Sequence, residues 1–185
     1  SGVGEPLDRE QTRATMAARA VALGLGHSGV SPEALRLLVK CLNADALPVV
    51  PSMGTVGASG DLTPLAHIAG ALMGEGEISH GGGPAEPAGA VLARLGFEPF
   101  TPGGKDALAL VNGTSAMTGI AGLNGQLAER ALKWSCVITA AHGQALDHRQ
   151  EAWHPALGTV RPHRGQQRIH QWLNALDAAS GQAPP

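Results

Sequence analysis

Apolar side chains recur every three or four residues along most of this chain, which is the spacing of one face of an α-helix. The clearest stripe consists of Leu35, Leu38, Val39 and Leu42. A second stripe runs from Leu65 to Met73. No segment shows a convincing alternation of apolar and polar positions, the mark of a half-buried strand. The pattern predicts an all-α protein with more than half of its residues in helices and no sheet larger than a short hairpin.

Cap residues indicate where several of these helices begin. Asp8 followed three residues later by Gln11 has the spacing of a capping box, in which each side chain binds the backbone N–H of the other residue. Ser31-Pro32 and Thr63-Pro64 each place an N-cap side chain before a proline in the first turn. We therefore expect one helix after Asp8, one after Ser31 and one after Thr63.

The longest helix is expected to run from a Thr114 cap to about His148. It is rich in Ala and Leu and low in charge, which is typical of a helix covered on most sides by a bundle or by other subunits. Shorter helices are expected over residues 88–95 and 166–178.

Glycine and proline interrupt this helical pattern at two places. Residues 48–60 contain both at short intervals, so an irregular loop is expected there. Residues 77–90 include three consecutive glycines and two prolines, which favours a flexible surface loop. Since no repeat divides the sequence, we expect one helical domain over residues 1–185.

Composition and charge narrow the function classes. The chain has 185 residues, 15% of them charged, and a formal net charge of -2. It has no basic surplus for binding nucleic acid and no apolar run near the roughly 20 residues of a membrane span. It begins at Ser1 without a signal-peptide pattern. These features favour a cytoplasmic protein and a chain cut from something longer.

Neither the cysteines nor the histidines have the spacing of metal ligands. Cys41 and Cys136 lie far apart, and buried apolar positions are expected for both. The eight histidines include no His-Glu-x-x-His pattern, so no metal site is expected. The three tryptophans are expected in a core or an interface; they are Trp134, Trp153 and Trp172.

The informative segment is residues 54–67, Gly-Thr-Val-Gly-Ala-Ser-Gly-Asp-Leu-Thr-Pro-Leu-Ala-His. It resembles the aromatic amino acid ammonia-lyases, which act on histidine, phenylalanine or tyrosine, and the related aminomutases. Residues 107–119, Ala-Leu-Ala-Leu-Val-Asn-Gly-Thr-Ser-Ala-Met-Thr-Gly, carry the resemblance further, as does Ser1-Gly2-Val3-Gly4. This second stretch and Glu151-Ala152-Trp153 are most similar to bacterial tyrosine ammonia-lyases and tyrosine aminomutases. More loosely, residues 161–166 also match.

The resemblance implies an electrophile, 4-methylideneimidazole-5-one (MIO), formed from Ala58, Ser59 and Gly60 without any external cofactor. The amide nitrogen of Gly60 would attack the carbonyl carbon of Ala58, and glycine permits that approach because it has no Cβ. Ser59 would then lose its hydroxyl as water. Asp61 would support the proton transfers of this cyclisation.

The resemblance also implies a reaction and an assembly. Asn112 would lie beside the electrophile and Leu62 would line the substrate pocket. The substrate amine adds to the electrophile, a base removes a β-proton, and a trans-arylacrylate and ammonia are released. The implied fold is the helical-bundle core of the fumarase/aspartase-like lyases, truncated here, and the implied assembly is a homotetramer.

One departure from the family is that this chain contains no tyrosine. In the family, the base is a tyrosine on a mobile N-terminal loop, and a second tyrosine and the arginine that holds the substrate carboxylate come from later segments. We therefore expect no appreciable activity from this chain alone. Three alternatives stay open: an aminomutase, a histidine ammonia-lyase, and a non-catalytic helical remnant that forms no MIO.

Overall fold

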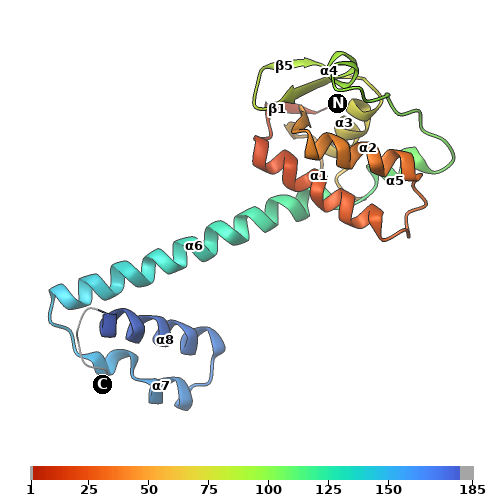
Figure 1. Cartoon of the computed structure of the whole chain (residues 1–185). Coiled ribbons are helices and arrows are strands. Elements are labelled where there is room, and N and C mark those ends of the chain that lie inside the picture. The colour runs from red at the N-terminus through yellow and green to blue at the C-terminus, as the bar shows by residue number, and fades with distance from the viewer. Residues whose placement is uncertain (1, 180–185) are drawn as a thin grey trace. The chain divides into compact units, whose positions relative to one another are not determined.

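The computed structural model describes residues 2–179 (Figure 1). Ser1, the first residue of one stretch that carries the resemblance, lies outside the described residues. The chain forms two compact units, of which the first ends at Asn124 and the second begins at Gly125. Because the helix α6 (Ser115–Ala145) is continuous across this boundary, the single domain expected from the sequence stays a prediction.

Helices make up about half of the first unit. They are α1 (Arg9–Gly24), α2 (Pro32–Asn43), α3 (Leu62–Leu72), α4 (Ala88–Arg94), α5 (Asp106–Val111) and the first part of α6. The capping box before α1 is confirmed, since Asp8 accepts the backbone N–H of Gln11 at 2.7 Å and Gln11 accepts that of Asp8 at 3.1 Å. Ser31 caps α2 as expected, by accepting the N–H of Ala34.

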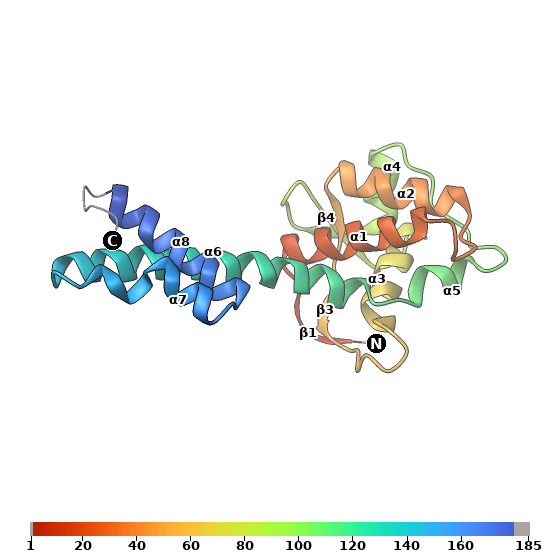
Figure 2. The ribbon, with the colours of Figure 1, turned by 90° about the horizontal axis from the view of Figure 1, so that it is seen from below.

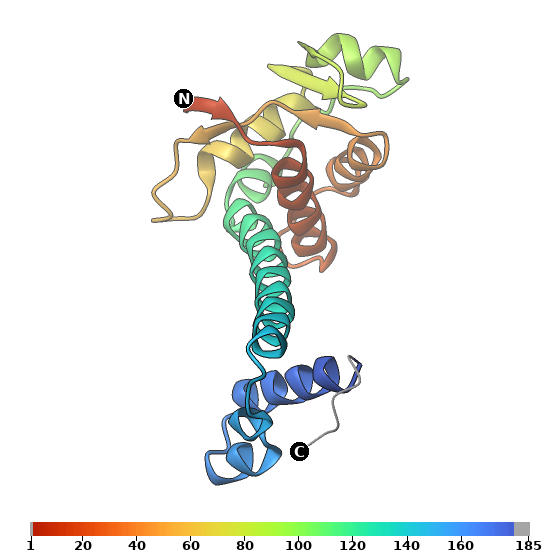
Figure 3. The ribbon, with the colours of Figure 1, turned by 90° about the vertical axis from the view of Figure 1, so that its left-hand side faces the viewer.

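The core of this unit is built from the apolar faces of α1 to α4. Its largest fully buried side chains include Met16, Leu38, Leu65, Leu72 and Leu92. At about 25 cal/mol per Å² of buried apolar surface, such side chains each contribute about 1.5–3 kcal/mol to stability. The first turns of α6 lie against α1 (Figure 3), where the Cα of Gly119 approaches the backbone of Ala14.

Two small antiparallel sheets complete the first unit. The first pairs β1 (Val3–Pro6) with β3 (Pro51–Met53), and the second has the order β2 (Ala46–Pro48), β4 (Glu77–His80), β5 (Ala85–Pro87). This three-stranded sheet corrects the expectation of nothing larger than a hairpin. Its strands escaped the sequence analysis because segments of three or four residues are too short to show a period of two.

The same sheet corrects the loop expected over residues 77–90. The glycines of that stretch form the turn between β4 and β5, and Ser79 donates its hydroxyl hydrogen to the carbonyl of Gly83 at 2.6 Å. Ile78, at the centre of β4, is buried in the core of the unit. The glycine and proline content of residues 77–90 thus indicated the turn correctly but gave no sign of the two strands that flank it.

The second unit contains the remainder of α6, the 3₁₀ turn η1 (Gln150–Trp153), α7 (Pro155–Val160) and α8 (Arg164–Ala179). Its core is small and consists of Cys136, Ala140 and Leu173 with partly buried residues, Trp153 and Trp172 among them. Asp177 is buried and accepts hydrogen bonds from Nε1 of Trp153 at 2.9 Å and Nε2 of Gln144 at 3.2 Å. The core placement of these two tryptophans is confirmed, whereas Trp134 is 58% exposed.

Helices therefore account for more than half of the described residues, and the mainly helical fold expected from the sequence is confirmed. Both cysteines are buried, also as expected. In the part of the chain that the structure describes, no helix is both long and apolar enough to cross a membrane.

Candidate active site

The segment expected to carry the chemistry, which we call the Ala-Ser-Gly loop (residues 54–61), connects β3 to α3 (Figure 2). Ala58 and Ser59 are exposed, and Gly60 is half-buried. The Thr55 side chain makes two hydrogen bonds within the loop. Its hydroxyl donates to the carbonyl of Gly60 at 3.1 Å and accepts the N–H of Gly57 at 3.2 Å. The side chain expected to react is therefore presented at the surface of a folded turn.

Thr63 has a different role from the one expected. The N-cap position of α3 is Asp61, and Thr63 lies within the first turn of the helix. Its hydroxyl donates to the carbonyl of Gly54 at 2.7 Å. Thr63 thus joins the start of the Ala-Ser-Gly loop to the helix that follows it, rather than capping that helix.

The far end of the loop packs directly on the turn that contains Gly113. A Cβ on Gly60 would lie 2.6 Å from the carbonyl oxygen and 2.9 Å from the nitrogen of Gly113. Gly60 also has φ +106°, which side chains rarely adopt. The N–H of Asp61 donates to the same Gly113 carbonyl at 2.7 Å. Only glycine fits at position 60, and two segments fifty residues apart in sequence meet there backbone to backbone.

The Asp61 side chain is 4% exposed and makes no cap hydrogen bond to its own helix. Its Oδ2 accepts the N–H of Met117, in the first turn of α6, at 2.8 Å. A carboxylate at that position satisfies an N–H that has no partner within the helix and lies at the positive end of the helix dipole. Asp61 therefore links the loop to α6, and its part in proton transfer stays a prediction.

A residue that the sequence analysis missed supports this arrangement from the other side. Arg19 of α1 is 4% exposed, and its Nη2 donates to the carbonyls of Ala109 and of Asn112, the latter at 2.8 Å. Burial lowers the pKa of the Arg19 guanidinium from its ordinary value. The signal was present in the sequence, because position 19 continues the buried stripe of α1 formed by Thr12, Thr15, Met16 and Leu23.

The two residues expected to contact substrate are both accessible. Leu62, at the start of α3, is 40% exposed, and Asn112, the C-cap of α5, is also accessible. Asn112 directly precedes Gly113, so the structure brings it to the loop, with its carbonyl held by Arg19. Exposed apolar side chains flank these positions in sequence; they are Met53, Val56, Leu108 and Met117.

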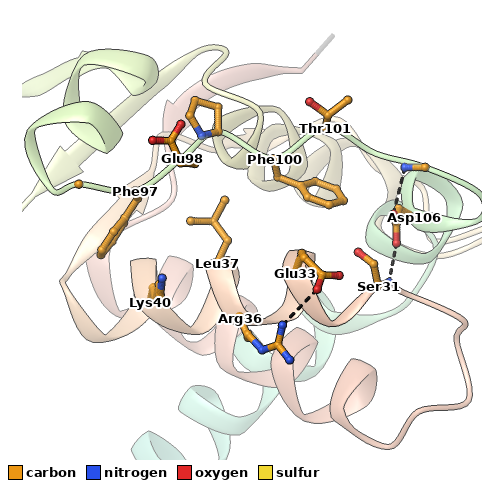
Figure 4. A pocket seen from close by; sticks show the side chains of 13 residues that line it. Ser31, Glu33, Arg36, Leu37, Lys40, Phe97, Glu98, Phe100, Thr101 and Asp106 are labelled. Carbon is orange, nitrogen blue, oxygen red and sulfur yellow. Dashed lines mark hydrogen bonds and ion pairs between the residues drawn. The ribbon is translucent and has the colours of Figure 1, made fainter.

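A groove of about 600 Å³ lies elsewhere in the first unit, between α2 and residues 96–106 (Figure 4). Two of its charged side chains pair with each other, Arg36 with Glu33 at 3.1 Å. Asp106 accepts the N–H groups of Ser31 and Gly103, and these bonds lower the pKa of its carboxyl. None of the residues expected in the active site lines this groove. Within residues 2–179, no group of three potential metal ligands is assembled.

Comparisons with known proteins identify the family of this chain. A sequence profile of the aromatic amino acid lyases matches residues 1–183. A histidine ammonia-lyase of Gloeobacter violaceus is 47% identical over 90% of this chain and 32% of its own length. A tyrosine ammonia-lyase of Cereibacter sphaeroides is 45% identical over 95% of this chain and 34% of its own length.

Among solved structures, the phenylalanine aminomutase of Pantoea agglomerans has a TM-score of 0.90 at 30% identity, covering 96% of this chain and 34% of its own. The chain thus spans about a third of the length of the relatives that it matches. The relative named for histidine is as similar as the one named for tyrosine, so similarity alone leaves the amino acid unassigned. The match over nearly the whole sequence shows that this chain belongs to the aromatic amino acid lyase family.

Proposed function

We propose that the protein is an ammonia-lyase for an aromatic L-amino acid and that its electrophile, MIO, forms from Ala58, Ser59 and Gly60. The observation that carries this proposal is the contact of Gly60 with Gly113, which leaves no room for a side chain at the position whose nitrogen must attack. By holding Gly60 against the Gly113 backbone, this contact reduces the number of loop conformations that must be searched before the Gly60 nitrogen meets the Ala58 carbonyl. No external cofactor is needed.

The residues present supply every atom of the ring. The nitrogen of Gly60 bonds to the carbonyl carbon of Ala58, and that carbonyl oxygen leaves as water with the amide hydrogens of Ser59 and Gly60. Ser59 then loses its hydroxyl and its α-hydrogen as a second water. No oxidant or reductant enters. The Thr55 hydroxyl bonded to the Gly60 carbonyl and the Gly113 carbonyl bonded to the Asp61 N–H hold the carbonyl end of Gly60 during closure.

Once present, the group supplies an electrophilic carbon that turns a substrate amine into a leaving group. The residues around it have separate tasks. Leu62 offers an exposed apolar surface for an aromatic side chain, and Asn112 offers an amide for polar groups of the substrate. Asp61 is engaged with Met117, and the chain contains no tyrosine, so we assign the removal of the β-proton to a base outside these residues.

Two measurements on one preparation test the electrophile. We expect an intact mass two waters below the sequence mass and near-ultraviolet absorbance beyond that of the three tryptophans. Ser59→Ala must abolish both signals while the helical circular dichroism stays unchanged, because the Ser59 side chain is exposed at the surface of the loop. An unmodified mass in the folded wild-type protein would instead identify a non-catalytic member of the family.

Substrate and product need a separate assay on the complete polypeptide in which this chain occurs. The stretch Glu151-Ala152-Trp153 favours tyrosine, whereas the similarity to a histidine ammonia-lyase supports histidine equally. Incubation with tyrosine, phenylalanine and histidine, followed by chromatography, separates arylacrylate from β-amino acid. Release of a β-amino acid as the main product would assign an aminomutase instead.

We include a cytoplasmic homotetramer in the proposal. The support for self-association is the exposed apolar surface of α6, where Leu127 is 62%, Trp134 58% and Ile138 65% exposed. Apolar side chains gathered on one helix favour contact with another protein surface. Light scattering of the complete polypeptide tests this, and we expect Ile138→Glu, a charge on that helix, to reduce the mass of the assembly. A monomeric wild-type protein would contradict the expectation.

A further inference from the structure

Arg19 is a charged residue in an energetically unfavourable, buried position. Its side chain is almost fully buried in the first unit, yet its hydrogen-bond partners in the described chain are backbone carbonyls rather than a carboxylate. Its Nε has no hydrogen-bond partner there. Burying a guanidinium without an opposite charge is unfavourable. An apolar residue would fill this place in a helix-packing core at less cost, so the position calls for a specific explanation.

The contacts of Arg19 lead to the Ala-Ser-Gly loop. Its Nη2 holds the carbonyl of Asn112 at 2.8 Å, and its Nη1 fills the space where a Cβ on Gly113 would be. The carbonyl of Gly113 accepts the N–H of Asp61, and the Gly113 backbone is the surface on which Gly60 packs. An unbroken series of contacts therefore runs from α1 through the turn at Gly113 to the nitrogen-bearing residue of ring closure.

We propose that Arg19 is a positioning residue for ring closure, which fixes the turn at Asn112-Gly113 as the surface that holds Gly60 in place. This inference rests on the proposed formation of MIO from residues 58–60. Without the guanidinium, the carbonyls of Ala109 and Asn112 lose a shared donor at the end of α5, and the turn is free to move away from Gly60. Ring closure depends on that contact because a displacement of about 1 Å between reacting groups costs on the order of 10²-fold in rate.

Arg13 provides a matched control on the same helix. Its Nη1 donates to the carbonyl of Leu42, in the last turn of α2, at 3.1 Å, and to Asp45 at 3.0 Å. Arg13 thus also binds a carbonyl at the end of a neighbouring helix, but its contacts do not reach the Ala-Ser-Gly loop. A role in stability alone predicts that Arg13→Met and Arg19→Met behave alike in ring formation.

The experiment follows ring closure directly, in the complete polypeptide. Wild type, Arg19→Met, Arg19→Lys and Arg13→Met are made by cell-free synthesis, and the folded fraction is sampled over time by intact mass spectrometry. We expect the loss of two waters to slow by about tenfold or more in Arg19→Met and by less than about twofold in Arg13→Met, whose contacts lie away from the loop. Arg19→Lys restores charge and a donor, so its rate should lie between those of Arg19→Met and wild type.

Gly113→Ala keeps Arg19 but forces its guanidinium aside, so it tests the same contacts if Arg19→Met does not fold. It should also slow ring closure. Closure at the wild-type rate in every folded variant among Arg19→Met, Arg19→Lys and Gly113→Ala would overturn the positioning role while leaving the proposed function intact. A folded wild-type protein that never loses the two waters would overturn the proposed function and this inference with it.

Discussion

The contact between Gly60 and Gly113 gives the sharpest prediction for stability. Gly60→Ala places a methyl group 2.6–3.0 Å from three backbone atoms of Gly113, and none of these is the movable end of a side chain. To isolate packing from ring chemistry, the change is made in a Ser59→Ala background, where no ring can form. The free energy of unfolding of the first unit then reports the contact alone.

The loss in unfolding free energy depends on how the structure accommodates the new methyl group, for which there are two possibilities. If the loop stays in place, the new alanine at position 60 adopts φ +106° at a cost of about 1–3 kcal/mol, and the crowding adds about 1–3 kcal/mol. If the loop moves away, the Asp61 N–H loses its bond to Gly113, worth about 0.5–1.5 kcal/mol, and the Asp61 carboxylate loses its bond to Met117, worth about 1.5–3 kcal/mol. Both routes are consistent with a loss of about 2–4 kcal/mol.

Gly57→Ala is the matched control in the same loop. Its φ of +68° lies in the left-handed region, but a Cβ there meets open space. We expect a loss of about 1 kcal/mol, the usual cost of that conformation for alanine. Urea unfolding should be followed by far-ultraviolet circular dichroism at a wavelength for helix, because all three tryptophans lie in the second unit and report on that unit alone.

With an m-value of about 2 kcal/mol/M, the two variants should differ by about 1 M in the urea midpoint of the first unit. Equal midpoints for Gly60→Ala and Gly57→Ala would refute the reasoning, because they would mean that the backbone of Gly113 does not limit position 60. The left-handed conformation, and not the contact, would then set the cost in both variants.

The remaining predictions concern single side chains. Asp61→Ala should destabilise the chain by about 2–3 kcal/mol because it leaves the partly buried N–H of Met117, at the start of α6, without a partner. Asp8→Ala, which removes an exposed cap, should cost about 1 kcal/mol. Equal losses in denaturant unfolding would contradict this difference. The Arg9 guanidinium lowers the pKa of Asp45 in the folded chain below its ordinary value of 3.8. The stability that ionised Asp45 adds to the folded chain is therefore fully present above pH 3.8. It is lost as the pH falls through the lowered pKa of the folded state. Thermal unfolding from pH 5 downward should show this loss, and Asp45→Asn should lack that part of the pH dependence. Burial raises the pKa of the Cys41 thiol to about 11. Iodoacetamide at pH 8 should therefore leave Cys41 unmodified in the folded chain and alkylate it after unfolding, which peptide mass mapping detects. Rapid labelling of the folded chain would show instead that the core opens locally.

The helices could be predicted from the sequence because their signals are long or carry caps. The capping box at Asp8 and the Ser31 cap placed α1 and α2 correctly, and α6 followed from a long segment that is rich in Ala and Leu and low in charge. The strands could not be predicted, because β2 to β5 have only three or four residues each. The pairing of β2 with β4 joins segments about thirty residues apart, and that is decided by the core around Ile78 rather than by local pattern.

The candidate site divides in the same way. Ala58, Ser59, Gly60 and Asp61 are contiguous, so a motif in the sequence identifies them. What holds them in place is not contiguous, since the support comes from the turn at Gly113, from the first turn of α6 and from α1. Such contacts exist only in the folded chain. The residues that make them lie at isolated positions in the sequence and form no motif.

This separation has a consequence for any sequence that carries the motif. In the proposed reaction Ala-Ser-Gly supplies the atoms of the ring, but a loop of small residues on its own has many conformations in which the Gly60 nitrogen is far from the Ala58 carbonyl. The structure restricts them through a glycine at 113, which lets the two backbones meet, and through Arg19, which fills the space behind that glycine. A chain that keeps residues 58–60 but carries a side chain at 113, or an apolar residue at 19, would retain the motif without the surface that holds Gly60, and we expect it to fold with its serine intact.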